Sequence, residues 1–306
     1  MRFQYILLVC LPFLTACDDD SFSQTVDIPF PEHEPLPALS LNLRSGDSLA
    51  YALLNLSRGI IDEPVENDTR VATTELYRDD VLIGTRSYPL SQELSTFETV
   101  MTLTEPIRDE ETNYRLVGKI DGFPDAVATQ VMPAAALFSD VEYTRDGALD
   151  NDGFRVDEVT FKLEDPAATT DYYAFRVTTP GQNCTFDETT MTSECTNDFT
   201  QFYSVFVSSP DPLLLEGLDF GLLLTDQSFN GGSVTVRLFA DSFNDGDLYL
   251  EVYRISEDAY RYARSFAAYI EAGDNPFAEP VQVHGNVENG YGAFVATNLE
   301  RVLLTQ

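Results

Sequence analysis

The chain has 306 residues, of which 51 are acidic and 18 basic, giving a formal charge of −33, and it has no tryptophan. Hydrophobic residues make up 43% of it, enough for one or two buried cores, which excludes a wholly disordered acidic chain. The lysines are limited to Lys119 and Lys162 and the arginines are scattered, which argues against binding to nucleic acid or anionic lipid. The two histidines leave little material for a multi-histidine metal centre.

The amino terminus has the pattern of a bacterial lipoprotein signal. Arg2 precedes an apolar stretch, residues 5–14, that is too short to span a bilayer. Residues 14–17, Leu-Thr-Ala-Cys, match a lipobox. We therefore expect residues 1–16 to be a signal peptide and Cys17 to be the lipidated first residue of the mature chain. The alternatives are a soluble secreted protein cut nearby and a short buried strand.

Residues 17–37 are expected to form an acidic, proline-bearing tether. Asp18, Asp19 and Asp20 follow Cys17 directly, and four prolines lie between residues 29 and 37. The aspartate run is either a solvated spacer or a sorting label, and as a label it has two meanings, inner-membrane retention or export to the cell surface. Without the signal the chain keeps 17 basic and 51 acidic residues, a charge of −34.

Two cysteines besides Cys17 remain in the mature chain, Cys184 and Cys195. They lie within a polar stretch, residues 178–199, between two aromatic-rich runs. Because the compartment is oxidising, we predict a Cys184–Cys195 disulfide that closes a long hairpin loop. Two free thiols are the alternative.

Short segments with strand character recur along the chain and predict an all-β, mainly antiparallel fold. In residues 38–135 they indicate a β-sandwich of immunoglobulin size, with clean alternation from Tyr114 to Ile120. The pattern pauses around residues 133–136 and resumes at Val156, so residues 136–306 are expected to form a second β-rich domain. The expected strands are residues 39–43, 48–56, 71–77, 96–103, 114–120, 156–163, 172–178, 199–207, 222–225, 233–239 and 248–255.

One amphipathic helix is predicted near residues 256–272. Ser256 can cap its amino end, and Glu257 and Asp258 suit the positive end of the helix dipole. Apolar residues then recur at helical spacing until Gly273 offers a stop. The apolar stripe is expected to pack against the second sheet.

Several motifs resemble a Bacteroidota lipoprotein family catalogued as domain of unknown function 4249. The most specific is the closing signature, to which we assign Asn275, Pro276, Phe277, Glu279, Pro280, Asn286, Glu288, Asn289, Gly290 and Gly292. Residues 224–231 resemble the mid-domain motif of the family, and Asp165-Pro166 followed by residues 171–173 resembles its strand-turn-strand segment. Residues 112–116, closing towards Pro133, are similar to the end of its amino-terminal domain.

The resemblance implies a surface or outer-membrane lipoprotein, often encoded beside TonB-dependent receptors, with no established activity and no catalytic residues to transfer. The Cys184–Cys195 insert and the acidity depart from the family pattern. In the closing signature, prolines bar regular structure and Asn289, Gly290 and Gly292 permit positive φ, so we expect an irregular crossing that packs Phe277 and Phe294 inward. A ligand-binding loop is the alternative.

Catalytic and metal-binding patterns are weak in this sequence. No Gly-x-Ser-x-Gly elbow is present, His33 lies in the tether, and His284 is expected to be structural or exposed. The acidic loop from Asp146 to Gly153 fails as a helix-loop-helix calcium site at both ends, which leaves an irregular calcium site or a solvated turn. We expect no catalytic residue, no metal and no cofactor.

The function expected from these observations is that of a non-enzymatic lipoprotein, anchored in the outer membrane and displayed at the cell surface, that assists a TonB-dependent transporter in nutrient uptake. The substrate is left open. The alternatives are an independent adhesin or glycan- or peptide-binding module and, third, a hydrolase using two carboxylates. The net charge is expected to be a solvated surface rather than a sign of a cationic ligand.

Overall fold

The computed structural model describes residues 33–59, 69–90, 99–109, 111–150, 152–167, 169–187, 192–241, 246–273 and 278–304. The chain divides into two units, Met1–Glu34 and Pro35–Gln306, and nearly all the described residues belong to the second. The predicted signal peptide and Cys17 lie outside the described residues. Everything below concerns the unit Pro35–Gln306.

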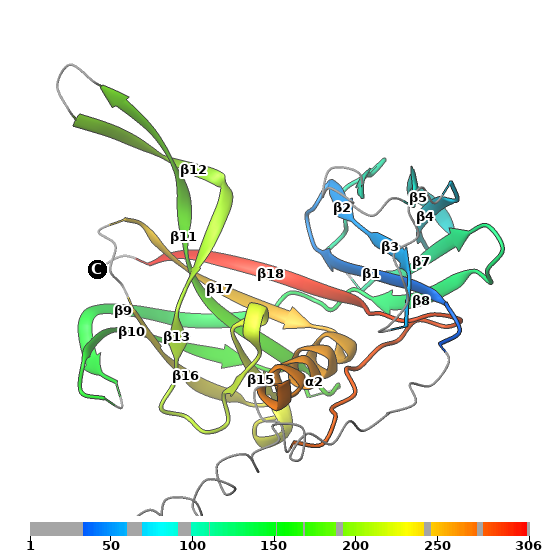
Figure 1. Ribbon diagram of the computed structural model, residues 1–306. Coiled ribbons are helices and arrows are strands. Elements are labelled where there is room, and N and C mark those ends of the chain that lie inside the picture. Colours follow the sequence, from blue (N-terminus) through cyan, green and yellow to red (C-terminus); the bar gives the residue numbers. More distant parts are fainter. Residues whose placement is uncertain are drawn as a thin grey trace, which may run out of the picture. The chain divides into compact units, whose positions relative to one another are not determined.

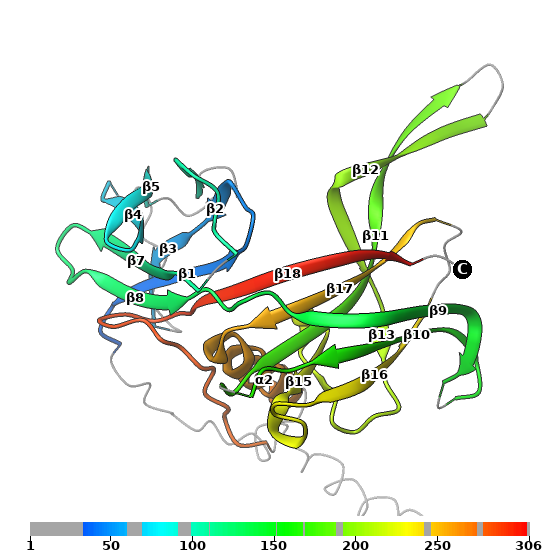
Figure 2. The same cartoon turned by 180° about the vertical axis from the view of Figure 1, so that it is seen from behind.

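This unit is built from β-strands and carries one α-helix within its described residues, as the sequence predicts (Figures 1 and 2). The strands of its first half run in chain order as β1 Pro37–Arg44, β2 Leu49–Tyr51, β3 Leu53–Leu56, β4 Val71–Arg78, β5 Val81–Pro89, β6 Val100–Thr102, β7 Asn113–Ile120 and β8 Ala126–Val131. Four of them form an antiparallel sheet in the order β5-β4-β7-β8. Alternating apolar side chains from β1, β4 and β7 meet in one buried core, in which Leu39, Leu76 and Leu116 are fully buried.

The described residues of the second half form ten further strands. They are β9 Leu137–Leu149, β10 Arg155–Glu164, β11 Tyr172–Asp187, β12 Thr192–Val205, β13 Val207–Ser208, β14 Leu215–Glu216, β15 Leu222–Thr225, β16 Ser233–Ala240, β17 Leu248–Ile255 and β18 Phe294–Leu304. One sheet has the order β13-β16-β10-β9, and a larger one runs β14-β15-β11-β17-β18-β1-β3. Their facing side chains enclose a second core, which includes the edge-to-face pair Phe161 and Phe175.

Strand β1 connects the two halves. It pairs in parallel with β18 and antiparallel with β3, so the large sheet continues from the second half into the first. Asn298 on β18 adds side-chain bonds: its Nδ2 donates to the carbonyl oxygens of Asp109 and Pro133, each at 2.9 Å, and its Oδ1 accepts from Ser45 Oγ at 2.8 Å. The junction between the halves is therefore a hydrogen-bonded sheet rather than a linker.

The predicted helix is present as α2 Glu257–Gly273. The Ser256 hydroxyl accepts a hydrogen bond from the Ala259 amide, as an amino-terminal cap should, and also from the Ala296 amide on β18. Ala259 and Ala263 are buried, and the helix packs onto the large sheet with Tyr253, Ile255 and Val295. Small residues on this face let the helix approach the sheet closely.

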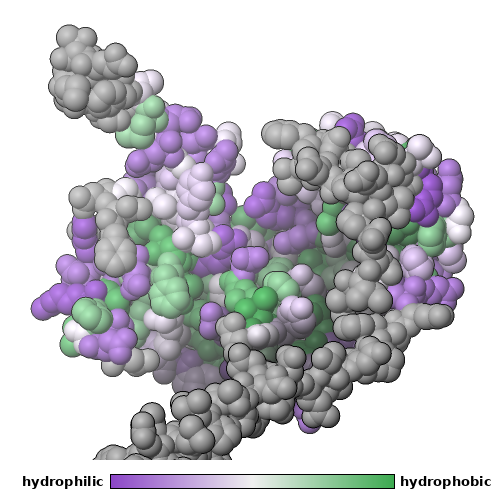
Figure 3. Space-filling view, in the orientation of Figure 1, coloured by the Kyte–Doolittle hydropathy of each residue, from purple (hydrophilic) through white to green (hydrophobic). Residues whose placement is uncertain are grey.

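The predicted disulfide between Cys184 and Cys195 is formed. The described residues of the expected long hairpin loop are regular structure, because β11 pairs with β12 as far as Asp187 and Thr192, with Cys184 opposite Cys195. The ribbon leaves the sheet and extends away from it (Figure 1). Hydrophilic residues cover most of its described surface (Figure 3), so a ribbon without a core of its own is held by the disulfide and by ladder hydrogen bonds.

The strands differ from the expected ones in several places, and β5, β8 and β9 were not expected. Residues 48–56 were predicted as one strand but form β2 and β3, because Leu49–Tyr51 pairs with β6 and Leu53–Leu56 pairs with β1. The sequence pattern pauses before Val156, yet β9 occupies Leu137–Leu149 there. β9 is an edge strand whose residues are exposed or half-buried, so it lacks the alternation by which strands are recognised.

Candidate functional site

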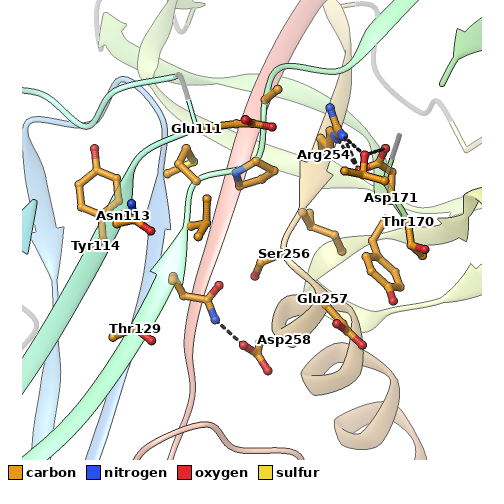
Figure 4. Close-up of a pocket in the computed structure, with 18 of the residues that line it drawn as sticks. Glu111, Asn113, Tyr114, Thr129, Thr170, Asp171, Arg254, Ser256, Glu257 and Asp258 are labelled. Atoms are coloured by element: carbon orange, nitrogen blue, oxygen red, sulfur yellow. Dashed lines mark hydrogen bonds and ion pairs between the residues drawn. The ribbon is translucent and has the colours of Figure 1, made fainter. Parts of the chain in front are cut away.

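A pocket of about 950 Å³ lies where the two halves of the unit meet (Figure 4). The first half lines it with the turn after β4, the start of β7 and the end of β8. The second half lines it with the segment before β11, the end of β17 and the first turn of α2. Apolar side chains also contribute to the lining, among them Val131, which is exposed, and Pro133, which is half-buried.

The β4–β5 turn forms one part of the rim. Asp79 and Asp80 are the two turn residues, and both have positive φ, 46° and 64°. A two-residue hairpin turn of this type favours Asn-Gly, because most side chains strain the left-handed backbone. The Asp79 amide donates to the Asn113 carbonyl at 3.0 Å, which fixes the turn beside β7. Glu111, just before β7, places a third exposed carboxylate at this wall (Figure 4).

The opposite wall contains a buried ion pair. Arg254 on β17 donates from Nε to Asp171 Oδ1 at 3.0 Å and from Nη2 to the same oxygen (Figure 4). The Thr169 hydroxyl donates to the other carboxylate oxygen at 2.9 Å. Both charged side chains are less than a tenth exposed. The guanidinium charge is thus neutralised within the wall and is not offered to a ligand.

Behind this wall three buried carboxylates come together, and we call Asp165, Asp171 and Asp226 the buried triad. One oxygen of each lies within 4.8 Å of the others. Asp165 accepts from Tyr173 Oη at 2.6 Å and from the Gly231 amide at 3.1 Å. Burial, followed by the nearby carboxylates of Asp165 and Asp171, raises the pKa of Asp226, while Asn230 Nδ2 donates to this carboxylate at 2.8 Å.

Carboxylate oxygens at this spacing are the ligands that Ca²⁺ or Mg²⁺ prefers, and within the described residues this triad is the group whose spacing suits a metal ion. Each member, however, already accepts a hydrogen bond from the protein, and Arg254 supplies a positive charge. We therefore assign the triad a structural role. Burial also raises the pKa of Tyr173, helped by its bond to Asp165, so this phenol stays a donor.

Asp258, in the first turn of α2, ties three segments together at the pocket wall. It accepts from Gln130 Nε2 on β8 at 2.6 Å, from Asn286 Nδ2 at 3.0 Å, and pairs with His284 Nε2 at 2.7 Å. Partial burial alone would raise the pKa of Asp258, but the hydrogen bonds from His284, Asn286 and Gln130 outweigh it and hold the pKa below its usual value. His284 has the structural role that the sequence suggests.

The closing signature forms an ordered crossing over β1. Its first three residues, Asn275, Pro276 and Phe277, lie outside the described residues, whereas Glu279, Pro280 and the later members are described. The side chain of Asn286 forms two hydrogen bonds with the backbone of Phe294, each at 2.8 Å. It accepts one from the amide and donates the other to the carbonyl oxygen. Phe294 is fully buried, in line with the expected inward packing.

Three signature positions show why small or flexible residues occupy them. Asn289 and Gly292 have positive φ, 57° and 111°. A Cβ on Gly292 would lie 2.1 Å from the Leu39 carbonyl oxygen, and one on Gly290 would lie 2.4 Å from that of Pro37. Glu288 pairs with Val127 on β8 through two backbone hydrogen bonds. The signature thus joins β1, β8 and β18 and supports the pocket without lining it.

The remaining candidates lie away from the pocket. Asp150 Oδ1 accepts from the amides of Asp152 and Phe154, at 2.9 and 2.8 Å, which is the geometry of a turn held by an aspartate side chain. Neither this loop nor the disulfide contributes to the pocket lining. Within the described residues, no helix is long and apolar enough to cross a membrane.

The pocket is where the separate motifs of the sequence meet. Asn113 and Tyr114, from residues 112–116, and Asp171 and Tyr172, from residues 171–173, line the pocket. Asp226, from residues 224–231, lies behind the wall. Asn286 of the closing signature donates a hydrogen bond to Asp258 in the lining. The model of the family described as "Domain of unknown function (DUF4249)" matches residues 25–301. The chain belongs to this family. Segments of this DUF4249 protein that are distant in sequence thus meet at one pocket.

Other comparisons add little. No curated protein matches the chain. Among solved structures, extracellular domains 3–5 of Drosophila OTK are similar, with 11% identity over 74% of this chain and 94% of that one and a TM-score of 0.20. A similarity this weak says nothing about the fold or the function of the DUF4249 protein.

Sequence reasoning missed the rim residues Asp79, Asp80 and Glu111. A signal was present, because Asp79-Asp80 occupies a two-residue turn position where Asn-Gly is usual. It also missed the buried triad, although all three members lie in motifs that carry the family resemblance. Nothing in the sequence indicates that these motifs converge.

Proposed function

We propose that this protein is a lipid-anchored, non-enzymatic binding component of the outer membrane that captures a ligand in the pocket and delivers it to a TonB-dependent transporter. The observation that carries the proposal is one pocket of about 950 Å³ whose walls come from both halves of the unit. Small-ligand sites are typically clefts of about 300–1,000 Å³ lined by apolar side chains and a few polar groups.

The location in the proposal rests on the sequence. The lipobox ending at Cys17 supplies the anchor, and the disulfide fits a compartment outside the cytoplasm. Acyl chains contribute about 0.8 kcal/mol per buried methylene, so an anchor with more than one chain is durable. The acidic residues after Cys17 suit an extended tether, and display at the cell surface would bring the pocket to the transporter mouth.

Co-purification tests the partnership. Affinity-tagged protein, solubilised from membranes in a mild nonionic detergent, should retain a TonB-dependent transporter that mass spectrometry identifies. The Cys17→Ala protein, which lacks the lipid, should be released from the membrane and should lose the transporter. A wild-type preparation that contains no such transporter would overturn the partnership, and protection of the protein from protease on intact cells would overturn surface display.

A second function, an independent adhesin or glycan-binding module, is favoured by aromatic side chains on and beside the hairpin. Phe199 and Tyr203 are 58% exposed and Phe206 is 68% exposed. Exposed aromatic rings can stack on sugars or on apolar side chains of a partner. A glycan array would support this function if Phe199→Ala and Tyr203→Ala abolished a signal of the wild-type protein, and the absence of any signal would remove the glycan-binding form of it.

A further inference from the structure

The pocket carries more negative than positive side chains. Its acidic members are Asp79, Asp80, Glu111, Asp171, Glu257 and Asp258, and its basic members are Arg115 and Arg254. Because the whole chain has far more acidic than basic residues, an acidic surface alone does not mark a site. What matters is which of these charged side chains already has a partner. The carboxylates also come from both walls, which the close-up shows for Glu111 on one side and Glu257 on the other (Figure 4).

Several of these charged side chains already have partners. Arg254 is buried against Asp171. Asp258 is held by His284. Arg115 lies 4.1 Å from the centre of the Tyr77 ring and 3.5 Å from Asp80, in an exposed pair. Arg254 is therefore not placed to attract an anionic ligand, and Arg115 is the basic side chain of the lining that remains accessible.

Other carboxylates remain available. Asp79 and Glu111 are exposed and have no ion-pair partner among the described residues. Glu257 pairs with Arg261 one helical turn away, but both side chains are more than half exposed. Exposed pairs of this kind contribute less than about 1 kcal/mol, so a ligand can compete with Arg261 for Glu257. The pocket thus presents available negative charge on two opposing walls.

The β4–β5 turn holds two of the carboxylates at the rim of the pocket. Asp79 and Asp80 have consecutive positive φ angles, as a two-residue hairpin turn of this type requires.

The shape of the pocket limits the ligand further. A volume of about 950 Å³ is far larger than a metal ion needs, and the lining includes the exposed side chain of Val131 and the half-buried Pro133. Tyr172, half-buried at the edge, provides an aromatic ring. Such a ring attracts an ammonium or guanidinium group as well as an apolar chain. The matching ligand therefore has a positive group and an apolar body.

We propose that the pocket binds an organic cation, an ammonium or guanidinium group carried on an apolar body, between Asp79 and Glu111 on one wall and Glu257 on the other. A peptide with lysine or arginine side chains has this chemistry. The inference rests on the proposed function, because it names the ligand class of the same pocket.

Calorimetric titration of the mature, lipidated protein in nonionic detergent tests the inference. The probes are three end-blocked peptides of equal length, Ala-Lys-Leu-Lys-Ala, Ala-Gln-Leu-Gln-Ala and Ala-Glu-Leu-Glu-Ala. The lysine peptide should bind at least tenfold more tightly than the other two, a difference of about 1.4 kcal/mol. Raising the salt from low to physiological concentration should weaken it, because the rim charges are screened.

A charge-matched pair of variants separates the pocket from the general acidity of the protein. D79N/E111Q neutralises one Asp and one Glu at the rim, and E142Q/D152N neutralises one of each at exposed positions outside the pocket lining. Asparagine tolerates positive φ, so the turn should stay folded, which unchanged circular dichroism and melting would verify. The rim variant should bind the lysine peptide at least tenfold more weakly than wild type, and the control within about twofold.

The outcomes are distinct. Equal losses in both variants would show attraction by net charge alone and would overturn the inference, as would no binding of the lysine peptide. Equal binding of the glutamine peptide would overturn the ligand class while leaving capture in the pocket in place. Tight lysine-peptide binding without a co-purified transporter would overturn the proposed partnership and leave the ligand class intact.

Discussion

Two groups of carboxylates lie on opposite sides of the same pocket and differ in every respect that decides their role. The buried triad is at most 8% exposed, and its members accept hydrogen bonds from Tyr173, Asn230 and Arg254. The rim residues are exposed, up to 93% for the side chain of Asp80, and their best ion pair is a solvated one. The comparison shows that partners and burial, rather than residue type, separate a structural aspartate from one available to a ligand.

The largest expected effect on stability is that of removing Arg254, whose positive charge lies beside the buried triad. Arg254→Met leaves three buried carboxylates without a positive partner, and breaking a buried ion pair in this way costs about 3–5 kcal/mol. Chemical denaturation should therefore show a large loss of unfolding free energy. Arg115→Met is the matched control at the rim, and it should cost at most about 1 kcal/mol because its pairing with Asp80 and Tyr77 is exposed. Equal costs would contradict the distinction.

Asp258 is an intermediate case, half-buried but fully hydrogen-bonded. Asp258→Asn should destabilise the protein by about 1–2 kcal/mol at pH 7, because one acceptor is lost and a donor faces other donors. The lowered folded-state pKa of Asp258 gives stability that is present above the unfolded pKa and lost as the pH falls through the folded pKa. The difference between variant and wild type should shrink over that acid window, and a constant difference would argue against an ionised Asp258.

For Asp226 the expected effect has the opposite sign, because removing its charge should stabilise the protein. Its folded-state pKa is raised, first by burial, so ionisation opposes folding as the pH rises from the unfolded pKa through the folded one. Asp226→Asn keeps an acceptor for Asn230 and removes the charge. It should be more stable than wild type by up to about 1 kcal/mol at neutral pH and equal to it below the unfolded pKa. Denaturation at pH 3 and pH 7 measures this, and greater stability of the wild type at pH 7 would point to a bound cation.

The smallest effect is expected at the rim turn. Asp80→Gly relaxes a left-handed residue but adds entropy to the unfolded chain, so the net gain in stability should be about 0.5 kcal/mol or less. Losing the exposed ion pair between Asp80 and Arg115 should cost little stability. Thermal unfolding should therefore occur at an unchanged or slightly higher temperature. A clear loss of stability would mean that Asp80 has a structural role like that of the triad.

Much of the local structure could be predicted because it depends on neighbouring residues. The helix was expected near residues 256–272 and is found at Glu257–Gly273, because a capping serine and a helical apolar stripe are local signals. The Cys184–Cys195 pair followed from counting cysteines in an oxidising compartment. Strand β9 escaped prediction, because an exposed edge strand has no buried face to impose alternation.

The sequence by itself therefore determined the β-rich class, the helix, the disulfide and the family, which all follow from local patterns and spacing. Only the tertiary structure decided that β1 pairs with β18, more than 250 residues along the chain, and that Asp165, Asp171 and Asp226 meet around Arg254. The physical reason is that the state of a carboxylate depends on its burial and on the donors that surround it. Those donors come from segments that adjoin only after the two sheets have packed, and this packing separates structural carboxylates such as Asp171 from exposed ones such as Asp79.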